Sequence, residues 1–355
     1  MLRRFISISI RAMHDARSLL LALFVVGISD FSTTNTFVTQ ASSSHIIVAP
    51  DGSGNYTTIQ AAVDAVPVKN PNHTVIYIKK GTYKEIVTVP SNKPYITFFG
   101  QDKNSTIITY DNYNAKQKSG GGTYGTDGSA TVFIEGDHFT ATNMTFQNTA
   151  GQVGQAVAIN VTADASYFDN CKFHGWQDTL YAHRGRQYYS NSYIDGNTDY
   201  VFGNATAVFE NTEFYSLGNK GSAITAQKRM SASETTGFVL INDKIDGAFA
   251  NSSHLGRPWG PYARVIVMNS QIGPDITAAG WKNWSTADYH LTAYFAEYNN
   301  TGPGSNTSNR ISWSHQLTAA EAKQYSVDKF LNQDGWLTST KQALNSLTTA
   351  GFLTK

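Results

Sequence analysis

From about residue 75 to about residue 275 the chain consists of short runs in which apolar and polar residues alternate, and helical periodicity is absent. The runs are rich in Val, Ile, Phe, Tyr and Thr, and Gly, Asn and Asp separate them, which predicts short strands joined by turns. An asparagine followed three residues later by an apolar residue recurs at intervals of 20 to 31 residues. The asparagines are Asn143, Asn170, Asn191, Asn211, Asn242 and Asn269.

A repeat of this length built only of strands is typical of a parallel β-helix, in which each coil stacks on its neighbour and buries a continuous apolar ladder. We expect the asparagines at the corners, because Asn tolerates left-handed backbone and stacked Asn side chains can form a hydrogen-bonded ladder. The unequal intervals predict inserted loops on some coils, and such loops commonly carry a functional site. The predicted fold class is therefore all-β, a single-stranded parallel β-helix.

Helical spacing appears only near the two ends of this region. Residues 55–67, "NYTTIQAAVDAVP", predict an amphipathic helix that begins at an Asn55 or Thr57 cap, stops at Pro67 and closes the N-terminal end of the solenoid. Residues 317–331 predict a C-terminal helix, capped at its start, that covers the other end or packs along the side.

Two further local patterns refine this picture. The cap of the C-terminal helix is Thr318, with Glu321 three residues later as in a capping box. The glycine-rich stretch at residues 118–129 predicts a long mobile loop.

The first thirty residues differ in composition from the rest of the chain. Their arginines precede a short apolar run at residues 19–28, which is too short to span a bilayer and is typical of a secretory signal. We therefore expect a signal peptide at residues 1–30, cleaved somewhere between residues 27 and 44, and a catalytic domain at residues 45–355. Removing four arginines and two aspartates with this segment changes the formal net charge from +1 to −1. A near-neutral body argues against nucleic acid as a partner.

Glycosylation motifs and cysteine usage agree with export. One cysteine, Cys171, excludes a disulfide framework, and no neighbouring feature marks its thiol as activated, so we expect it in the core. These features predict a secreted, extracellular glycoprotein that is not embedded in a membrane. Ten sequons occur, at Asn55, Asn72, Asn104, Asn143, Asn160, Asn204, Asn251, Asn283, Asn299 and Asn306.

The segment "GWQDTLYAHRGRQYYSNSYIDGNTDYVFG" places polar groups one repeat apart. Asp178 and Asp199 are 21 residues apart, and Gln155 and Gln177 are 22 apart, so we expect them in one column on three successive coils. Adjacent coils stack about 4.8 Å apart. Two carboxyl groups at this distance shift each other's pKa, so that one tends to stay protonated while the other is ionised. One can then act as general acid and the other as nucleophile or base. On this geometry alone a retaining glycosidase and an esterase are equally consistent.

Aromatic residues and an arginine accompany the carboxylates in the sequence. Tyr181, Phe202 and Trp259 beside Arg257 suit a sugar ring with an acidic substituent, although Phe202 could equally belong to the core. Trp176, Tyr200 and Tyr262 lie in the same segments.

Other catalytic classes lack their signatures. No serine has glycine at both flanking offsets of a G-x-S-x-G elbow, and the Asp-Asp and Gly-His-Gly motifs of β-helical polygalacturonases are absent. The nine histidines have no ligand spacing and no carboxylate cluster lies near Asp178, so we expect neither a metal nor another cofactor. We expect His174 and His183 at a rim or turn.

Several motifs in one order give the chain a family resemblance. From residue 45 to 340 it resembles the pectin methylesterases (pectinesterases), through "APDGSGNYTTIQAAVDAVP", "IKKGTYKE", "GQAVAI", "GWQDTLY", "DYVFG", "LGRPWGPYARVIVMNS" and "EYNNTGPG". The resemblance implies a right-handed parallel β-helix and hydrolysis of methyl esters in pectin. It favours the esterase over the glycosidase.

The resemblance also implies a role for each residue of the column. Asp199 would be the nucleophile, and Asp178 the acid that protonates methanol and then the base that activates water. Gln155 and Gln177 would donate to the oxyanion, and Arg257 would pair with Asp199 and keep it ionised. A carbohydrate-binding solenoid without catalysis would not need this whole set.

The resemblance extends to substrate contacts, partners and one departure. Glu85 of "GTYKE" is either a substrate contact or a structural residue, and Ser192 replaces the cysteine that many relatives pair with the one at Cys171. We expect a monomer that acts on methyl-esterified pectin and is a candidate for binding a proteinaceous pectinesterase inhibitor. The residues expected to contact the substrate are Thr82, Gln155, Tyr181, Phe202, Arg257 and Trp259.

Overall fold

The structure is a computed structural model that describes residues 46–218 and 222–349. The expected signal peptide and its cleavage region lie outside the described residues. All described elements belong to one compact unit, Ser43–Lys355. Within them, no helix is both long enough and apolar enough to cross a membrane.

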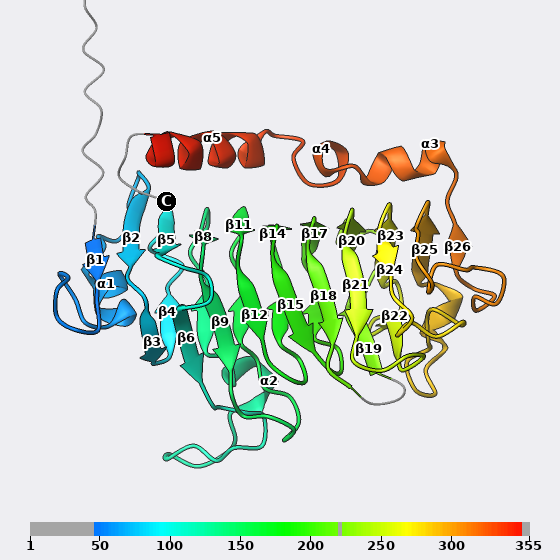
Figure 1. Cartoon of the computed structure of the whole chain (residues 1–355), viewed down its shortest axis with the longest axis horizontal. Helices are drawn as coiled ribbons and strands as arrows, with labels where there is room; N and C mark the ends of the chain where they lie inside the picture. The colour runs from blue at the N-terminus through cyan, green and yellow to red at the C-terminus, as the bar shows by residue number, and fades with distance from the viewer. Residues whose placement is uncertain (1–45, 219–221, 350–355) are drawn as a thin grey trace, which may run out of the picture. The chain divides into compact units, whose positions relative to one another are not determined.

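Three parallel sheets make up the body of this unit (Figure 1). Sheet A contains β1 (Ile46–Val48), β2 (Thr74–Ile78), β5 (Ile96–Gly100), β8 (Thr140–Thr142), β11 (Ser166–Asp169), β14 (Arg186–Ser190), β17 (Thr206–Glu210), β20 (Gly237–Ile241), β23 (Arg264–Met268), β25 (Tyr294–Tyr298) and β26 (His315–Gln316). Sheet B contains β3 (Gly81–Lys84), β6 (Thr106–Tyr110), β9 (Thr145–Asn148), β12 (Lys172–His174), β15 (Tyr193–Gly196), β18 (Glu213–Ser216), β21 (Lys244–Gly247) and β24 (Gln271–Ile272). Sheet C contains β4 (Val87–Val89), β7 (Val132–Ile134), β10 (Ile159–Val161), β13 (Leu180–Ala182), β16 (Val201–Gly203), β19 (Ser222–Gln227) and β22 (Ser253–Pro258).

The chain visits the sheets in the order A, B, C, so each circuit of three strands is one coil of a parallel β-helix. Strands of successive coils pair in register, as in β12 with β15 and β13 with β16. The predicted fold class is confirmed.

The asparagine repeat marks the corner between sheets A and B. All six predicted asparagines have left-handed backbone, with φ between 50° and 58°. The apolar residue that follows each one lies on sheet B in register with its equivalents, as Phe173 lies between Phe146 and Ile194. These side chains are completely buried and form one ladder through the core.

The expected side-chain ladder of the asparagines is only partly present. Asn170 Nδ2 donates to Asn143 Oδ1 at 2.6 Å, whereas Asn191 Nδ2 donates to Asp169 Oδ1 at 2.7 Å. The competing carboxylate acceptor interrupts the ladder after two coils.

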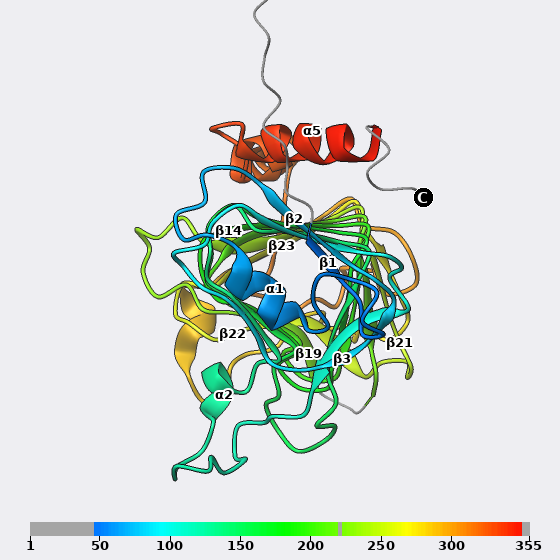
Figure 2. The ribbon, with the colours of Figure 1, turned by 90° about the vertical axis from the view of Figure 1, so that its left-hand side faces the viewer.

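Helix α1 (Ile59–Ala65) lies across the N-terminal end of the coil, as expected (Figure 2). Its N-cap is Thr58 rather than Asn55 or Thr57, because the Thr58 hydroxyl accepts from Ala61 N at 3.3 Å. The helix ends before Pro67, with Val66 as its C-cap.

Side chains from the first coils satisfy both ends of α1. The Glu85 carboxylate accepts from the backbone N–H groups of Ile59 and Gln60 at 2.8 and 3.0 Å. The buried Lys93 ammonium donates to the carbonyl oxygens of Val63 and Asp64 at 3.0 and 2.7 Å. Of the two roles expected for Glu85, the contacts within the protein therefore favour the structural one.

The C-terminal helical segment is broken into short pieces. The predicted Thr318 and Glu321 capping box is present, but it starts only α3 (Ala319–Ala322), followed by the 3₁₀ turn η2 (Lys323–Tyr325) and α4 (Val327–Phe330). The longest helix of the described residues, α5 (Trp336–Thr349), was not predicted from the sequence. Its residues "WLTSTKQALNSLTT" are rich in Ser and Thr and carry a weak apolar stripe.

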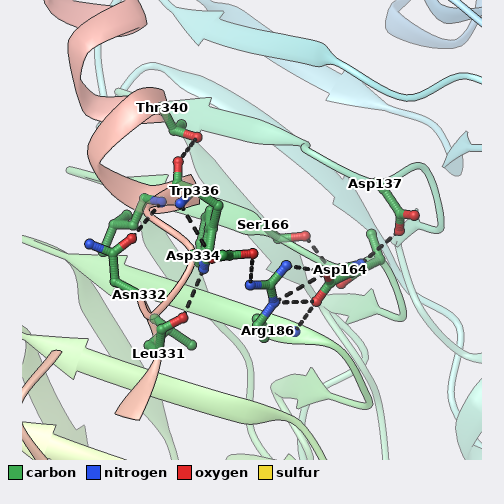
Figure 3. A network of polar contacts seen from close by, with 11 residues as sticks. Asp137, Asp164, Ser166, Arg186, Leu331, Asn332, Asp334, Trp336 and Thr340 are labelled. Carbon is green, nitrogen blue, oxygen red and sulfur yellow. Dashed lines mark hydrogen bonds and ion pairs between the residues drawn. The ribbon is translucent and has the colours of Figure 1, made fainter. Parts of the chain in front are cut away.

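Helices α3 to α5 run along sheet A (Figure 1), and polar contacts join α5 to it (Figure 3). Arg186 of β14 forms ion pairs with Asp164 at 2.7 Å and with Asp334, just before α5, at 2.6 Å. Lys341 of α5 donates to the Tyr188 hydroxyl at 3.1 Å. The C-terminal segment therefore packs along the side, one of the two positions expected for it.

The glycine-rich stretch predicted as a long mobile loop contains some regular structure. It contains an isolated bridge between Gln117 and Thr123 and the single-turn helix α2 (Gly125–Gly128). The short 3₁₀ helix η1 (Asp288–Leu291) lies between β24 and β25 in the chain.

Candidate active site

A cleft of about 420 Å³ opens where sheet B passes into sheet C. Loops at this corner supply most of its polar lining, and strands of sheet C supply most of its aromatic lining. The lining residues are Thr126, Asp127, Gln155, Gln177, Asp178, Tyr181, His183, Asp199, Phe202, Ala226, Lys228, Arg257, Trp259 and Trp284.

The predicted polar column lies in this cleft. Gln155 forms a parallel backbone bridge with Gln177, and Gln177 forms one with Thr198 on the next coil. Asp178 and Asp199 therefore occupy equivalent positions on neighbouring coils, about 4.8 Å apart along the stack. The repeat length in the sequence had predicted this juxtaposition.

Both aspartates have left-handed backbone, with φ of 63° at Asp178 and 49° at Asp199. Each is fixed by a backbone hydrogen bond to the following coil, from Asp178 N to Thr198 O at 3.1 Å and from Asp199 N to Ala223 O at 2.7 Å. Aspartate is among the few residues other than glycine that visit this conformation routinely.

Arg257 of β22 forms a two-pronged pair with Asp199. Its Nε donates to Asp199 Oδ1 at 2.8 Å, and its second guanidinium nitrogen donates to Asp199 Oδ2. The ring of Trp284 lies under the guanidinium, 4.2 Å from its central carbon. Both partners are largely withdrawn from solvent, with side chains 22% and 7% exposed.

The two carboxyl groups have different electrostatic surroundings. Burial raises the pKa of Asp178 well above its ordinary value, and the charge of Asp199 raises it further. Burial also raises the pKa of Asp199, but the hydrogen bonds and charge of Arg257 oppose that rise. The pair therefore favours a protonated Asp178 beside an ionised Asp199, which is the arrangement of one acid and one nucleophile.

Sheet C builds the aromatic wall of the cleft. Tyr181 and Phe202 are register neighbours on β13 and β16, and their rings stack 4.1 Å apart. His183 stacks on the Tyr181 ring at 4.1 Å, and the ring of Trp259 lies 5.9 Å from that of Phe202. Burial lowers the pKa of His183. Phe202 is buried in a small apolar cluster with Tyr181 and also lines the cleft, so both of its predicted positions apply.

Other predicted residues lie outside the lining. Thr82 is exposed on β3 of sheet B and does not line the cleft, so its substrate contact stays a prediction. Tyr200 is completely buried in the core, with its hydroxyl 3.3 Å from that of Ser216. Trp176 and Tyr262 do not line the cleft either.

Six lining residues were not predicted as site residues, and one of them, Ala226 of β19, is apolar. Thr126 and Asp127 come from α2, in the stretch interpreted as a mobile loop. No sequence motif marks His183, Lys228 or Trp284. Strand register and the course of the loops bring these side chains to the cleft. The segment "WKNW", with Trp281 in the core and Trp284 in the cleft, offered the clearest missed signal.

A second layer of contacts holds the loop that carries Gln177 and Asp178. The buried Asp195 carboxylate accepts from His174 Nδ1 at 2.7 Å and from Gly175 N at 3.3 Å, and the Asp195 carbonyl accepts from the Thr179 hydroxyl at 3.0 Å. A Cβ at Gly175 would lie 2.7 Å from the Thr179 hydroxyl oxygen, so this close packing requires glycine there.

Cys171 is buried and free, as expected, and burial raises the pKa of its thiol. Ser192 lies on the neighbouring coil, where its hydroxyl accepts from Cys171 N at 3.1 Å. Across residues 46–218 and 222–349, no three histidine, cysteine or carboxylate side chains gather into a group that could hold a metal ion.

Comparison with known proteins identifies relatives of the whole catalytic region. The family model described as pectinesterase matches residues 45–334. Pectinesterase 31 of Arabidopsis thaliana is 41% identical over 303 residues, covering 83% of this chain and 94% of that protein. Other Arabidopsis relatives carry names that join pectinesterase with pectinesterase inhibitor, and the chain spans about half of their length.

Solved structures agree with the sequence matches. The pectin methylesterase from carrot superposes with a TM-score of 0.78 at 38% identity, covering 83% of this chain and 95% of that one. A pectin methylesterase solved in complex with a hexasaccharide superposes with a TM-score of 0.69 at 26% identity, covering 81% and 96%.

Proposed function

The chain belongs to the pectinesterase family, and on that premise we propose that its cleft hydrolyses methyl esters of galacturonate units in pectin through an aspartyl nucleophile. The observation that carries this mechanism is the buried Arg257–Asp199 pair beside Asp178. It places a carboxyl group held by a cation, which opposes the rise in its pKa, beside a second carboxyl group whose pKa burial and the charge of Asp199 raise well above the ordinary value.

In the first half of the reaction, an Asp199 carboxylate oxygen attacks the ester carbonyl carbon. The bond to the methoxy oxygen breaks as Asp178 gives that oxygen its proton, and methanol leaves. The galacturonyl group is then bound to Asp199 as an acyl-enzyme.

In the second half, the Asp178 carboxylate takes a proton from water, and the resulting hydroxide attacks the acyl carbon. Asp199 leaves as a carboxylate, Asp178 is again protonated, and the product is a free galacturonate carboxyl group. One ester and one water give one acid and one methanol, so no further reactant is required.

Gln155 and Gln177 would stabilise both tetrahedral intermediates. They are register neighbours on successive coils and both line the cleft, so their amide N–H groups can converge on the developing oxyanion. Donors placed in advance where charge develops supply the largest single contribution in many enzymes.

The aromatic wall supports binding of a sugar polymer. Trp259 is half-buried at the cleft and offers its ring to the substrate, whereas Tyr181 is stacked between His183 and Phe202 and can only border the cleft with its ring edge. Pyranose C–H groups pack on such aromatic surfaces. The hexasaccharide complex described for a structural relative supports an oligogalacturonide as the occupant.

The test measures methanol and new reducing ends together after incubation with methylated pectin. Methanol without new reducing ends is the expected result for an esterase, whereas new reducing ends would indicate glycosidase or lyase chemistry. Asp199→Asn is expected to abolish methanol release while the thermal midpoint stays near that of the wild type. Asp178→Asn should also cripple turnover, and Asp64→Asn, an exposed carboxylate on α1, serves as the matched control.

Export is a further part of this proposal. Residues 1–30 would direct secretion, and sequencing the N-terminus of the protein recovered from culture medium tests it. A mature chain that begins at residue 1 would contradict the proposal. Exposed sequons such as Asn104 and Asn306 are the better glycan acceptors, because Asn160 is buried and its side-chain amide oxygen Oδ1 lies 3.3 Å from His183 Nδ1.

A further inference from the structure

Lys228 is a cation in the cleft that the reaction described above does not use. It follows directly after β19, its backbone N–H donates to Gly203 O at 2.8 Å, and it is half-buried. Its ammonium nitrogen lies 4.2 Å from the centre of the Trp259 ring. The side chain is therefore directed toward the aromatic wall along which a sugar polymer would lie.

Two other charged side chains of the cleft, Arg257 and Asp127, already have partners within the protein. Arg257 holds Asp199 with both prongs of its guanidinium. Asp127 is a hydrogen-bond partner of the Tyr181 hydroxyl, and together with burial it raises the pKa of Tyr181. By contrast, no ion pair joins Lys228 to an acidic side chain within residues 46–218 and 222–349. Its charge faces the substrate space.

The register places Lys228 away from the reacting groups. Ala226 pairs with Arg257 across β19 and β22, and Lys228 lies two residues further along the chain. Two residues of a strand advance by about 7 Å, so Lys228 is displaced along sheet C from the row that holds Arg257. Asp199 lies on the opposite side of that row, because it precedes Phe202, the other register partner of Ala226, by three residues. A carboxylate that meets Lys228 therefore belongs to a different sugar unit from the one whose ester reacts.

We propose that Lys228 binds the free carboxylate of a galacturonate unit next to the unit being hydrolysed, so that the enzyme prefers esters flanked by a de-esterified unit. The idea rests on the proposed function, since it assigns a neighbouring subsite to the same cleft. A methyl ester at that subsite offers no charge to Lys228 and leaves the half-buried ammonium unpaired. A carboxylate there forms a charge-assisted hydrogen bond above the Trp259 ring.

The experiment compares two pentagalacturonates, one esterified on all five units and one esterified on its central unit only. Initial rates of methanol release give kcat/KM for each, and their ratio measures the preference. Wild type should favour the singly esterified oligomer. Lys228→Met, which keeps a side chain of similar length on Trp259, should lower the ratio roughly tenfold, the scale of one hydrogen bond to a charged group. Lys228→Arg should restore it.

Lys244→Met is the matched control, because Lys244 pairs with Glu213 on sheet B at 2.7 Å and lies outside the cleft. Its ratio should equal that of wild type, and the wild-type preference should shrink as salt is added. A Lys228→Met ratio equal to that of wild type, with a normal thermal midpoint, would overturn the role of Lys228 alone. Absence of methanol from both oligomers with wild-type protein would instead overturn the proposed function and the subsite with it.

Discussion

Removing the guanidinium of Arg257 isolates the electrostatic basis of the nucleophile. Arg257→Met keeps most of the side-chain length but deletes both hydrogen bonds and the positive charge opposite Asp199. The Asp199 carboxylate would then be buried without its cation. Loss of one partner of a buried pair costs about 3–5 kcal/mol, which corresponds to a pKa rise of roughly 2–4 units at 1.36 kcal/mol per unit.

The sign of the effect follows from which form reacts. Asp199 attacks only as a carboxylate, so a higher pKa means that more of the enzyme is protonated and inactive at a given pH. The acid limb of the kcat/KM profile for methanol release should move to higher pH by that amount. Arg257→Lys, which keeps the charge but loses the fork, should shift the limb by less.

A loss of activity with the acid limb in its original place would refute this reasoning, because Arg257 would then act only in binding or folding. Arg186→Met is the control, since Arg186 of β14 lies outside the cleft and pairs there with Asp164 and Asp334. It should leave the pH profile unmoved.

Three further changes have defined outcomes. Burial and the charge of Asp246 raise the pKa of Asp275 to about 6, so ionising it costs stability as the pH rises from about 4 to 6. Above pH 6, Asp275→Asn should raise the free energy of urea unfolding by up to about 3 kcal/mol, and at pH 4 it should not. Glu85→Ala removes the acceptor for two N–H groups of α1 and should cost about 1–2 kcal/mol in urea unfolding, with Glu85→Gln milder. Gln177→Ala should lower kcat roughly 10²-fold if its amide serves the oxyanion, and unchanged kinetics would make its role structural.

Periodicity predicted those features that depend on the stacking of coils. The spacing of Asp178 and Asp199 equals one circuit of the chain, so their proximity follows from repeat length without knowledge of side-chain packing. The corner asparagines followed in the same way, because each needs left-handed backbone at a fixed point of the coil.

Features that depend on loop path and surface packing were missed. Lys228 and Trp284 reach the cleft through segments of irregular length, and neither residue type marks a site by itself. Helix α5 is stabilised by contacts such as Lys341 with Tyr188 and not by a strong apolar stripe, so its own sequence gives little signal. Thr58 rather than Thr57 caps α1, an offset of one residue that pattern alone does not resolve.

Asp178 and Asp199 share their backbone conformation with the corner asparagines of the same coil, although they sit at a different corner. At such a position asparagine and aspartate are interchangeable as far as the backbone is concerned, and most other residues are not. A single Asn–Asp exchange can therefore switch the chemistry of a coil on or off without altering its path. The solenoid thus offers a way to design or evolve an active site one coil further along, by changing side chains at positions that the backbone already accepts.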